Sequence, residues 1–297
     1  MRRILIIGAG DVAVRLVPKL TKKFRVFALV RRADAAAKLR DLSVTPILGD
    51  LDAPASLKRL AGIADAVFHF APPPTVGATD TRTRHLIAAL ESARSLPQRV
   101  VYISTTGVYG NCHGAWVSET HRLRPTTDRA KRRVDAEQQL RAWAGRSGVT
   151  LSILRAPGIY GDGRLPEARL RAATPVLLDE DDVYTNHIHA DDLANISLTT
   201  LFRGRPGRVY NASDDSELKM GDYFDLAADM LSLPRPARIS RVEAELQLPG
   251  MMMSFMSESR RLTNYRLKKE LTVRLIYPMI RDGIKAHIDK LNYESKR

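Results

Sequence analysis

Short apolar runs alternate with helical patterns along the first 160 residues. Each run has the length of a buried strand, and a segment with helical spacing of its apolar residues follows most of them. Strands are expected at residues 3–7, 24–30, 45–48, 66–70, 100–104 and 151–154. Helices are expected at residues 12–20, 33–42, 56–60, 80–93 and 127–144. This alternation is typical of an α/β fold in which helices cover both faces of a parallel sheet.

The second half of the chain is less regular, and prolines interrupt it repeatedly. Helices are expected at residues 191–203, 222–231, 257–271 and 277–291, and a strand at residues 207–211. We therefore expect one or two strands from this half to join the sheet. The predicted division is a sheet domain over residues 1–160, to which parts of 186–211 return, and a smaller lobe built mainly from residues 161–297.

A glycine-rich turn follows the first predicted strand and opens the first predicted helix. The residues Gly8, Gly10 and Ala13 give the pattern G-x-G-x-x-A, which is the fingerprint of a dinucleotide-binding turn in this context. Gly8 allows a tight turn, Gly10 lets the main chain approach a diphosphate, and Ala13 allows close packing of the helix on the strand. The helix N-terminus then offers free N–H groups to phosphates. Asp11 places a negative charge near those phosphates, unless it serves as the N-cap of the helix.

The end of the second predicted strand distinguishes between the two nicotinamide cofactors. A carboxylate there would bind the ribose hydroxyls of NAD, but this strand ends in Arg31 and Arg32, and no carboxylate appears before Asp34. Guanidinium groups suit a 2′-phosphate, which predicts NADP rather than NAD. The alternative is that both arginines are ordinary solvated surface residues.

Composition and charge narrow the class of protein further. The chain has 297 residues and a formal net charge of +14, which suits either a nucleic-acid binder or an enzyme for anionic ligands. The basic residues are spread out and follow no known nucleic-acid-binding pattern, so nucleic acid is an unlikely partner. No apolar run is long enough to cross a membrane. The single cysteine, Cys112, excludes a disulfide scaffold and favours a cytoplasmic location.

Six motifs in order resemble those of the short-chain dehydrogenase/reductase superfamily, in its extended or atypical epimerase/dehydratase-like branch. After the glycine turn they are residues 48–51 (LGDL), 67–73 (VFHFAPP), 101–110 (VYISTTGVYG), 154–161 (LRAPGIYG) and the pair 188–194 (IHADDLA) and 209–211 (VYN). The resemblance covers nearly the whole chain. It implies a Rossmann-like, doubly wound parallel sheet and a small C-terminal substrate lobe, with the active site between them.

The resemblance also assigns roles to individual residues. The cofactor-binding residues that it and the glycine turn imply are Gly8, Gly10, Asp11, Val12, Ala13, Arg31, Arg32, Asp50, Leu51, Ala71, Pro72, Pro73, Ser104, Arg133, Pro157, Gly158 and Ile159. Thr105 corresponds to the Ser/Thr that hydrogen-bonds the substrate oxygen. His189 and the aspartates after it correspond to a structural turn and cap, so no metal site is expected. A homodimer formed through the helices that flank the active-site segment is one arrangement open to such proteins.

The catalytic pattern of the family is broken. Its members carry Tyr-x-x-x-Lys on the helix after the active-site loop, where this chain has Arg129 and Arg133, or Thr127 and Lys131 if the register slips by two. Arginine stays protonated and cannot shuttle a proton. Tyr109 is the best remaining acid, since nearby arginines would lower its pKa. The alternative is that it only lines the substrate pocket. Asp80 is either a second substitute or a helix N-cap.

Two functions follow from these observations. The leading interpretation is an NADP-dependent oxidoreductase or epimerase/dehydratase-like enzyme for a small polar, sugar-related substrate, with Thr105 and Tyr109 as catalytic residues. Arg260 and Arg261 lie where the family places the far end of the substrate, so an anionic substrate group is a further option beside plain surface charge. The alternative is a catalytically impaired NADP(H)-binding regulatory or sensor protein.

Overall fold

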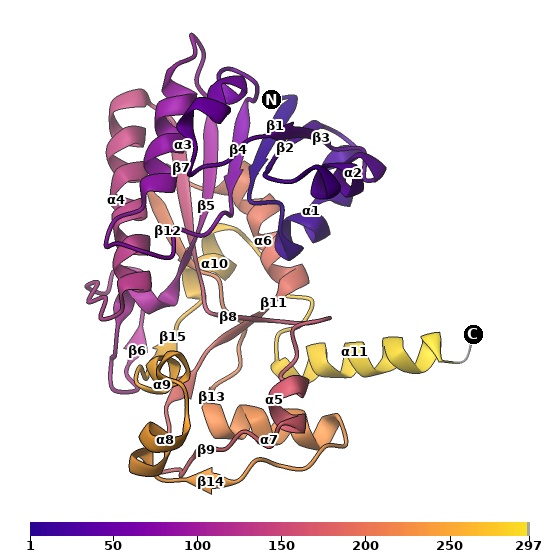
Figure 1. Ribbon diagram of the computed structural model, residues 1–297, viewed down its shortest axis with the longest axis vertical. Helices are drawn as coiled ribbons and strands as arrows, with labels where there is room; N and C mark the ends of the chain where they lie inside the picture. Colours follow the sequence, from indigo (N-terminus) through magenta and orange to yellow (C-terminus); the bar gives the residue numbers. More distant parts are fainter. Residues whose placement is uncertain (296–297) are drawn as a thin grey trace.

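A seven-stranded sheet runs through the larger part of the molecule (Figure 1). This computed structural model describes residues 1–295. The strand order is β12-β7-β5-β4-β1-β2-β3, and every neighbouring pair is parallel. The strands are β1 (Arg3–Ile7), β2 (Arg25–Val30), β3 (Thr45–Leu48), β4 (Ala66–His69), β5 (Arg99–Thr105), β7 (Thr150–Ala156) and β12 (Arg208–Asn211). The order reverses between β1 and β4, which is where an open α/β sheet leaves a crevice for a ligand.

Helices cover both faces of the sheet, as predicted. On one face lie α1 (Asp11–Thr21), α2 (Ala33–Asp41) and α6 (Ala190–Arg203), and on the other lie η1 (Pro54–Leu60), α3 (Thr81–Glu91) and α4 (Asp128–Ser147). Strand β1 shows how the sequence achieves this. Ile4 and Ile6 enter the core under α1, while Leu5 and Ile7 enter the core under α3 and α4. Alternate side chains of a strand point to opposite faces, so a continuous apolar run serves two cores.

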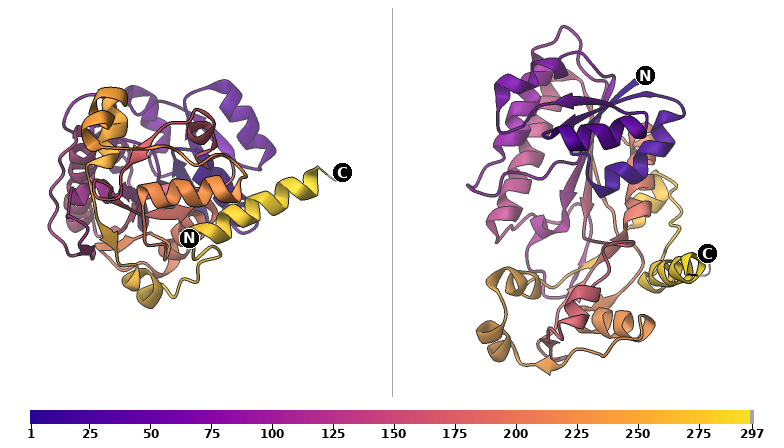
Figure 2. Two further views of the ribbon diagram at one scale, coloured as in Figure 1. Left: turned by 90° about the horizontal axis from the view of Figure 1, so that it is seen from below. Right: turned by 45° about the vertical axis from the view of Figure 1, so that its right-hand side comes forward.

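The second half of the chain builds a smaller lobe below the carboxyl ends of the strands (Figure 1). Figure 2 shows α11 projecting sideways from the body of the molecule. The helices of this half, besides α6, are α5 (Glu167–Arg171), α7 (Met220–Met230), α8 (Arg241–Gln247), α9 (Gly250–Met256), α10 (Tyr265–Glu270) and α11 (Ile280–Glu294). The short strands pair as β8 (Gly158–Tyr160) with β11 (His187–His189), β10 (Tyr184–Thr185) with β13 (Leu218–Lys219), β9 (Val176–Leu177) with β14 (Arg238–Ile239), and β6 (Trp116–Val117) with β15 (Arg261–Leu262).

Most of the predicted elements lie within three residues of their expected bounds, and α1 continues through Pro18. The helix predicted over residues 257–271 is wrong. Residues 261–262 form strand β15 instead, because the N–H of Arg261 donates to the carbonyl of Ala115 and that of Thr263 donates to the carbonyl of Val117. Only residues 265–270 are helical there. Pairing with a distant strand outweighs the local helical pattern. Within residues 1–295, no helix combines the length and apolarity that a membrane span requires.

Candidate functional site

Two cavities open at the carboxyl ends of the strands, and they adjoin at Pro72 and Arg133, which line both. The larger has a volume of about 850 Å³ and the smaller about 450 Å³. The predicted residues that line the larger cavity are Gly8, Gly10, Asp11, Val12, Ala13, Arg31, Arg32, Asp50, Leu51, Ala71, Pro72, Arg133 and Ile159. Those that line the smaller cavity are Pro72, Pro73, Thr105, Arg133, Pro157 and Gly158. Ser104 and Tyr109 line neither of these cavities.

The glycine turn closes one end of the larger cavity. Gly8 has φ +93°, and a Cβ atom there would lie 2.7 Å from the Cα of Ala71 and 2.8 Å from the carbonyl carbon of Phe70. A side chain is therefore excluded at this position. A Cβ at Gly10 would meet no atom within 4 Å, so this main chain is open to the cavity. Helix α1 begins directly behind it and directs its free N–H groups there.

Asp11 does not cap α1. Gly10 is the N-cap, and Asp11 is the first helical residue. Its carboxylate accepts hydrogen bonds from Nε of Arg15 at 2.9 Å and from Nε of Arg164 at 2.8 Å. The negative charge beside the turn is thus neutralised by two guanidinium groups, and one of them, Arg164, lines the cavity itself.

The opposite end of the larger cavity is basic. Arg31 and Arg32 line it, and Arg32 pairs with Asp34 at 3.1 Å through side chains that are both exposed. Arg82 lines it as well and binds Asp52 through two hydrogen bonds of 2.8 and 2.6 Å. In total five arginines and two aspartates line this cavity. Sequence reasoning missed Arg82 and Arg164, because neither lies in a motif, and only the tertiary structure brings them to the cavity.

Helix α4 resolves the two registers that the sequence left open. Arg129 and Arg133 line the cavities one helical turn apart, while Lys131 is exposed and pairs with Asp128 at 3.2 Å. Arg133 donates hydrogen bonds to the hydroxyl of Tyr102 at 2.9 Å and to the carbonyl of Ile103 at 2.8 Å. The arginines therefore occupy the positions that face the cleft. Thr127 caps the helix by accepting a hydrogen bond from the N–H of Ala130.

Tyr109 lies outside the linings of both cavities, and two side chains hold its hydroxyl. Its side chain is fully buried, donates a hydrogen bond to Oδ1 of Asn211 at 2.7 Å, and accepts one from Arg155 at 3.0 Å. The lowered pKa expected from nearby arginines is wrong, since burial outweighs the charge of Arg155 and raises the pKa of this phenol. Asp80 is the N-cap of α3 and accepts a hydrogen bond from the N–H of Thr83 at 3.1 Å, so the capping alternative is confirmed.

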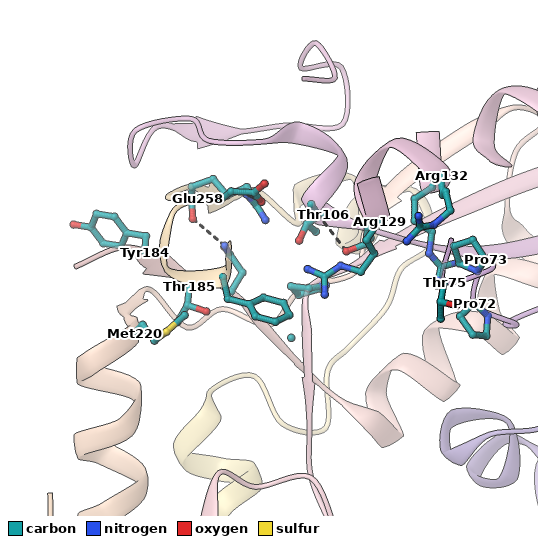
Figure 3. Close-up of a pocket in the computed structure, with 18 of the residues that line it drawn as sticks. Pro72, Pro73, Thr75, Thr106, Arg129, Arg132, Tyr184, Thr185, Met220 and Glu258 are labelled. Carbon is teal, nitrogen blue, oxygen red and sulfur yellow. Dashed lines mark hydrogen bonds and ion pairs between the residues drawn. The ribbon is translucent and has the colours of Figure 1, made fainter. Parts of the chain in front are cut away.

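Besides Thr105 and Arg129, the smaller cavity contains polar groups that the sequence analysis did not single out, namely Arg132, Tyr184 and Glu258. Thr105 lines it, and its Oγ1 accepts a hydrogen bond from the N–H of Gly107 at 3.3 Å, which leaves the hydroxyl proton free to donate. Figure 3 shows Glu258, Tyr184, Arg129 and Arg132 around the same space. Tyr184 and Glu258 lie in segments far from α4 in the sequence, so no local spacing could reveal them. Among the described residues, no group of three His, Cys, Asp or Glu side chains could hold a metal ion.

Comparisons with known proteins agree with this geometry. A family model described as NAD(P)H-binding matches residues 8–203. A ketoreductase from Stigmatella aurantiaca, which acts on 4-hydroxy-2-methyl-3-oxo-4-farnesyl-3,4-dihydroquinoline-1-oxide, is 27% identical over 92% of this chain and 88% of its own length. A conserved protein of unknown function from Silicibacter pomeroyi has a similar structure, with a TM-score of 0.79 and 30% identity, covering 98% of this chain and 99% of that one.

A putative NAD-dependent epimerase/dehydratase from Methylobacillus flagellatus is also similar in structure, with a TM-score of 0.74 and 25% identity over 98% of this chain and 99% of that one. The family model covers most of the chain, and it includes the glycine turn and the arginine-bearing helix. This protein therefore belongs to the NAD(P)H-binding family, in the epimerase/dehydratase-like group of short-chain dehydrogenases/reductases.

Proposed function

We propose that the protein is an NADP(H)-dependent oxidoreductase or epimerase/dehydratase-like enzyme that acts on a small polar substrate. The observation that carries this proposal is the pair of adjoining cavities, the larger of which has a bare glycine turn at one end and arginines at the other. A dinucleotide in the larger cavity would direct its nicotinamide toward Pro72 and Arg133, where the substrate cavity begins. The relatives are named as a ketoreductase and a putative epimerase/dehydratase, which supports the same class.

The residues of the larger cavity fit such a cofactor. The main chain of residues 8–13 would hold the diphosphate, because a Cβ at Gly10 would meet no protein atom and the N-terminus of α1 lies behind the turn. Asp50 and Leu51 would lie against the adenosine, and Arg31 and Arg32 would hold its 2′-phosphate. Arg133 would lie beside the nicotinamide ribose. The bound cofactor would supply the hydride, and the protein would supply orientation and charge.

In the smaller cavity, Thr105 would donate its hydroxyl proton to the substrate oxygen. Arg129 would stabilise negative charge on that oxygen without exchanging a proton, since a guanidinium stays protonated. Among the charged or phenolic side chains that line this cavity, only Glu258 and Tyr184 can exchange a proton at ordinary pH.

A sensor protein that binds NADP(H) without turnover is the second candidate. The observation that favours it is the replacement of the proton-transferring tyrosine by Arg129, together with the burial of Tyr109 away from both cavities. Oxidation of NADPH across a panel of aldehydes and ketones separates the two functions. Turnover supports the enzyme, whereas partner binding that changes with the oxidation state of the cofactor, without turnover, supports the sensor.

Calorimetric titration with NADPH and NADH tests the cofactor. We expect NADPH to bind at least about tenfold more tightly, since two charge-assisted contacts to a phosphate are involved. Replacement of both Arg31 and Arg32 by Gln should remove this preference and leave the affinity for NADH nearly unchanged. Equal affinity of the wild-type protein for the two cofactors would overturn the assignment of NADP, and binding of neither would overturn the proposed function.

A further inference from the structure

Positive charge is concentrated in the smaller cavity, beyond the place that the cofactor would take. Four arginines (Arg129, Arg132, Arg133 and Arg260) line it, against a single carboxylate, Glu258. Figure 3 shows Arg129 reaching into the cavity from the side on which Thr106 also lies. Like charges repel one another strongly in a partly enclosed space, so this excess of positive charge is costly unless an anion balances it.

The single carboxylate of the cavity is already engaged. Glu258 accepts hydrogen bonds from the hydroxyl of Thr126 at 2.7 Å and from Arg260 at 2.9 Å. Within residues 1–295, none of Arg129, Arg132 and Arg133 forms an ion pair with a carboxylate. These three arginines of α4 therefore form no ion pair within the described chain, and Glu258 attracts Arg129 only at longer range.

Arg132 is the most informative of these cations. The residue as a whole is only 7% exposed, and its side chain donates one hydrogen bond, to the carbonyl of Gly77. Its Nε is buried and has no hydrogen-bond partner in the described chain, and the same holds for Nε of Arg260. A buried charged donor without a partner costs free energy, and an anion bound at the outer nitrogens of these guanidinium groups would offset part of that cost.

The position of these arginines on the helix also favours the binding of an anion. Arg129 lies in the first turn of α4, where the helix dipole disfavours cations and favours anions, and Arg132 and Arg133 follow in the second turn. The wall opposite is apolar in part, since the guanidinium of Arg129 lies 4.4 Å from the ring centroid of Phe255, on α9 of the small lobe. The site thus combines bare guanidinium groups with an aromatic surface.

We propose that the substrate carries a carboxylate or phosphate group, and that Arg129 and Arg132 bind this group in the smaller cavity with support from Arg260. The proposal rests on the proposed function, and it specifies the substrate as a compact organic anion with a carbonyl or hydroxyl group next to it. Arg129 takes the place of the missing tyrosine and binds charge where other members of the group transfer a proton. The apolar part of the substrate lies against Phe255.

Anion binding to the protein saturated with NADP⁺ tests this proposal. Saturation fills the phosphate site at the glycine turn, so titration with inorganic phosphate and with malonate reports on the smaller cavity. We expect one of these probes to bind, and the tighter one indicates whether the substrate group is a phosphate or a carboxylate. Arg132→Gln and Arg129→Gln should each weaken that binding at least about tenfold.

Arg146→Gln is the matched control. It removes the same charge from the last turn of the same helix, where Arg146 pairs with Glu91 at 2.8 Å and lines neither cavity. We expect it to bind the probe within about twofold of the wild-type protein. Should Arg132→Gln fail to fold, Arg129→Gln still decides the question, because the side chain of Arg129 is solvent-exposed.

The outcomes separate the two proposals. Absence of probe binding up to about 50 mM, or equal affinity in the wild-type protein and both variants, would overturn the anion site even if NADP⁺ binds. If NADP⁺ itself does not bind, the proposed function fails. Titration of the cofactor-free protein and of Arg132→Gln then still tests the anion site, since the component of binding that this variant loses belongs to the smaller cavity.

Discussion

Gly8 and Gly10 are two residues apart, yet a side chain would affect them differently. At Gly8 the main chain is in the left-handed region, and a Cβ would collide with the main chain of residues 70–71. We expect Gly8→Ala to lower the free energy of unfolding by about 2 kcal/mol or more. Gly10→Ala should cost about 0.5–1 kcal/mol at the N-cap, because its Cβ has free space.

Both variants should lose most of their affinity for NADPH, since both residues line the larger cavity. Chemical denaturation and fluorescence titration of the two proteins provide the measurement. Equal stability of the two variants would mean that the turn does not pack against the end of β4 in solution. Undiminished NADPH binding by Gly10→Ala would show that the diphosphate lies elsewhere.

Tyr109 lies in a family motif, but its contacts in the structure say more about its role than its place in that motif does. Its hydroxyl joins Asn211 on β12 to Arg155 on β7, and Arg155 also pairs with the buried Glu137 of α4 at 2.7 Å. We expect Tyr109→Phe to lower the free energy of unfolding by about 1–3 kcal/mol, because buried polar groups lose a partner. Affinity for NADPH should not change. A variant of unchanged stability that has lost all turnover would restore the catalytic role of this residue.

At the scale of single elements, the sequence predicted the strands and helices of the sheet domain because their signals are local. A run such as Arg3–Ile7 followed by two glycines is sufficient to predict a buried strand, a tight turn and a helix. The helix predicted over residues 257–271 was wrong because strand β15 forms only through pairing with β6, which no local pattern encodes. Elements with a strong local pattern can be predicted, whereas a two-residue strand such as β15, which has no such pattern and forms only against a distant partner, cannot.

The two cavities of the candidate site differ in the same way, since the lining of one could be predicted from local motifs and the lining of the other could not. The larger cavity is built mainly from motif residues at the ends of successive parallel strands, so its lining could be predicted. The smaller cavity combines segments 72–75, 105–107, 184–186 and 255–260 with α4, and the path of the chain through the small lobe decides which of them meet. The role of helix α4 could be described only from its sequence motif and the fold together. Its sequence showed that the tyrosine is missing, but only the fold shows that Arg129 and Arg133, rather than Thr127 and Lys131, face the cleft.

At the scale of the whole molecule, the sheet domain and the small lobe meet through a layer of aromatic rings, most of which are buried. The ring centroids of His187 on β11 and Tyr223 on α7 are 4.2 Å apart. Those of His189 and Tyr277 are 4.0 Å apart. Tyr160 on β8 packs edge-on against both histidines. Nδ1 of His189 also accepts a hydrogen bond from the N–H of Asp191, which caps α6 as the resemblance implied. These contacts place the lobe beneath the smaller cavity.

This layer links the stability of the molecule to pH. Burial lowers the pKa of His187 to about 3, so the folded protein keeps this ring neutral, whereas the unfolded chain protonates it below about pH 6.5. Unfolding then takes up a proton, and the free energy of unfolding falls by up to about 1.4 kcal/mol for each pH unit below 6.5 through this residue alone. We expect His187→Asn and His187→Phe to show a shallower loss of stability between pH 6.5 and 4.5 than the wild-type protein. Urea denaturation at several pH values measures this slope.

The two variants will differ in absolute stability, because they pack differently against Tyr223, but they should share the same slope, since neither side chain titrates. All three proteins keep Asp214, whose pKa burial raises to about 8, so the opposite contribution of that carboxylate cancels in the comparison. A slope identical to that of the wild-type protein in both variants would mean that His187 is hydrated in the folded state, and that the lobe does not close over the sheet domain as the ring layer indicates.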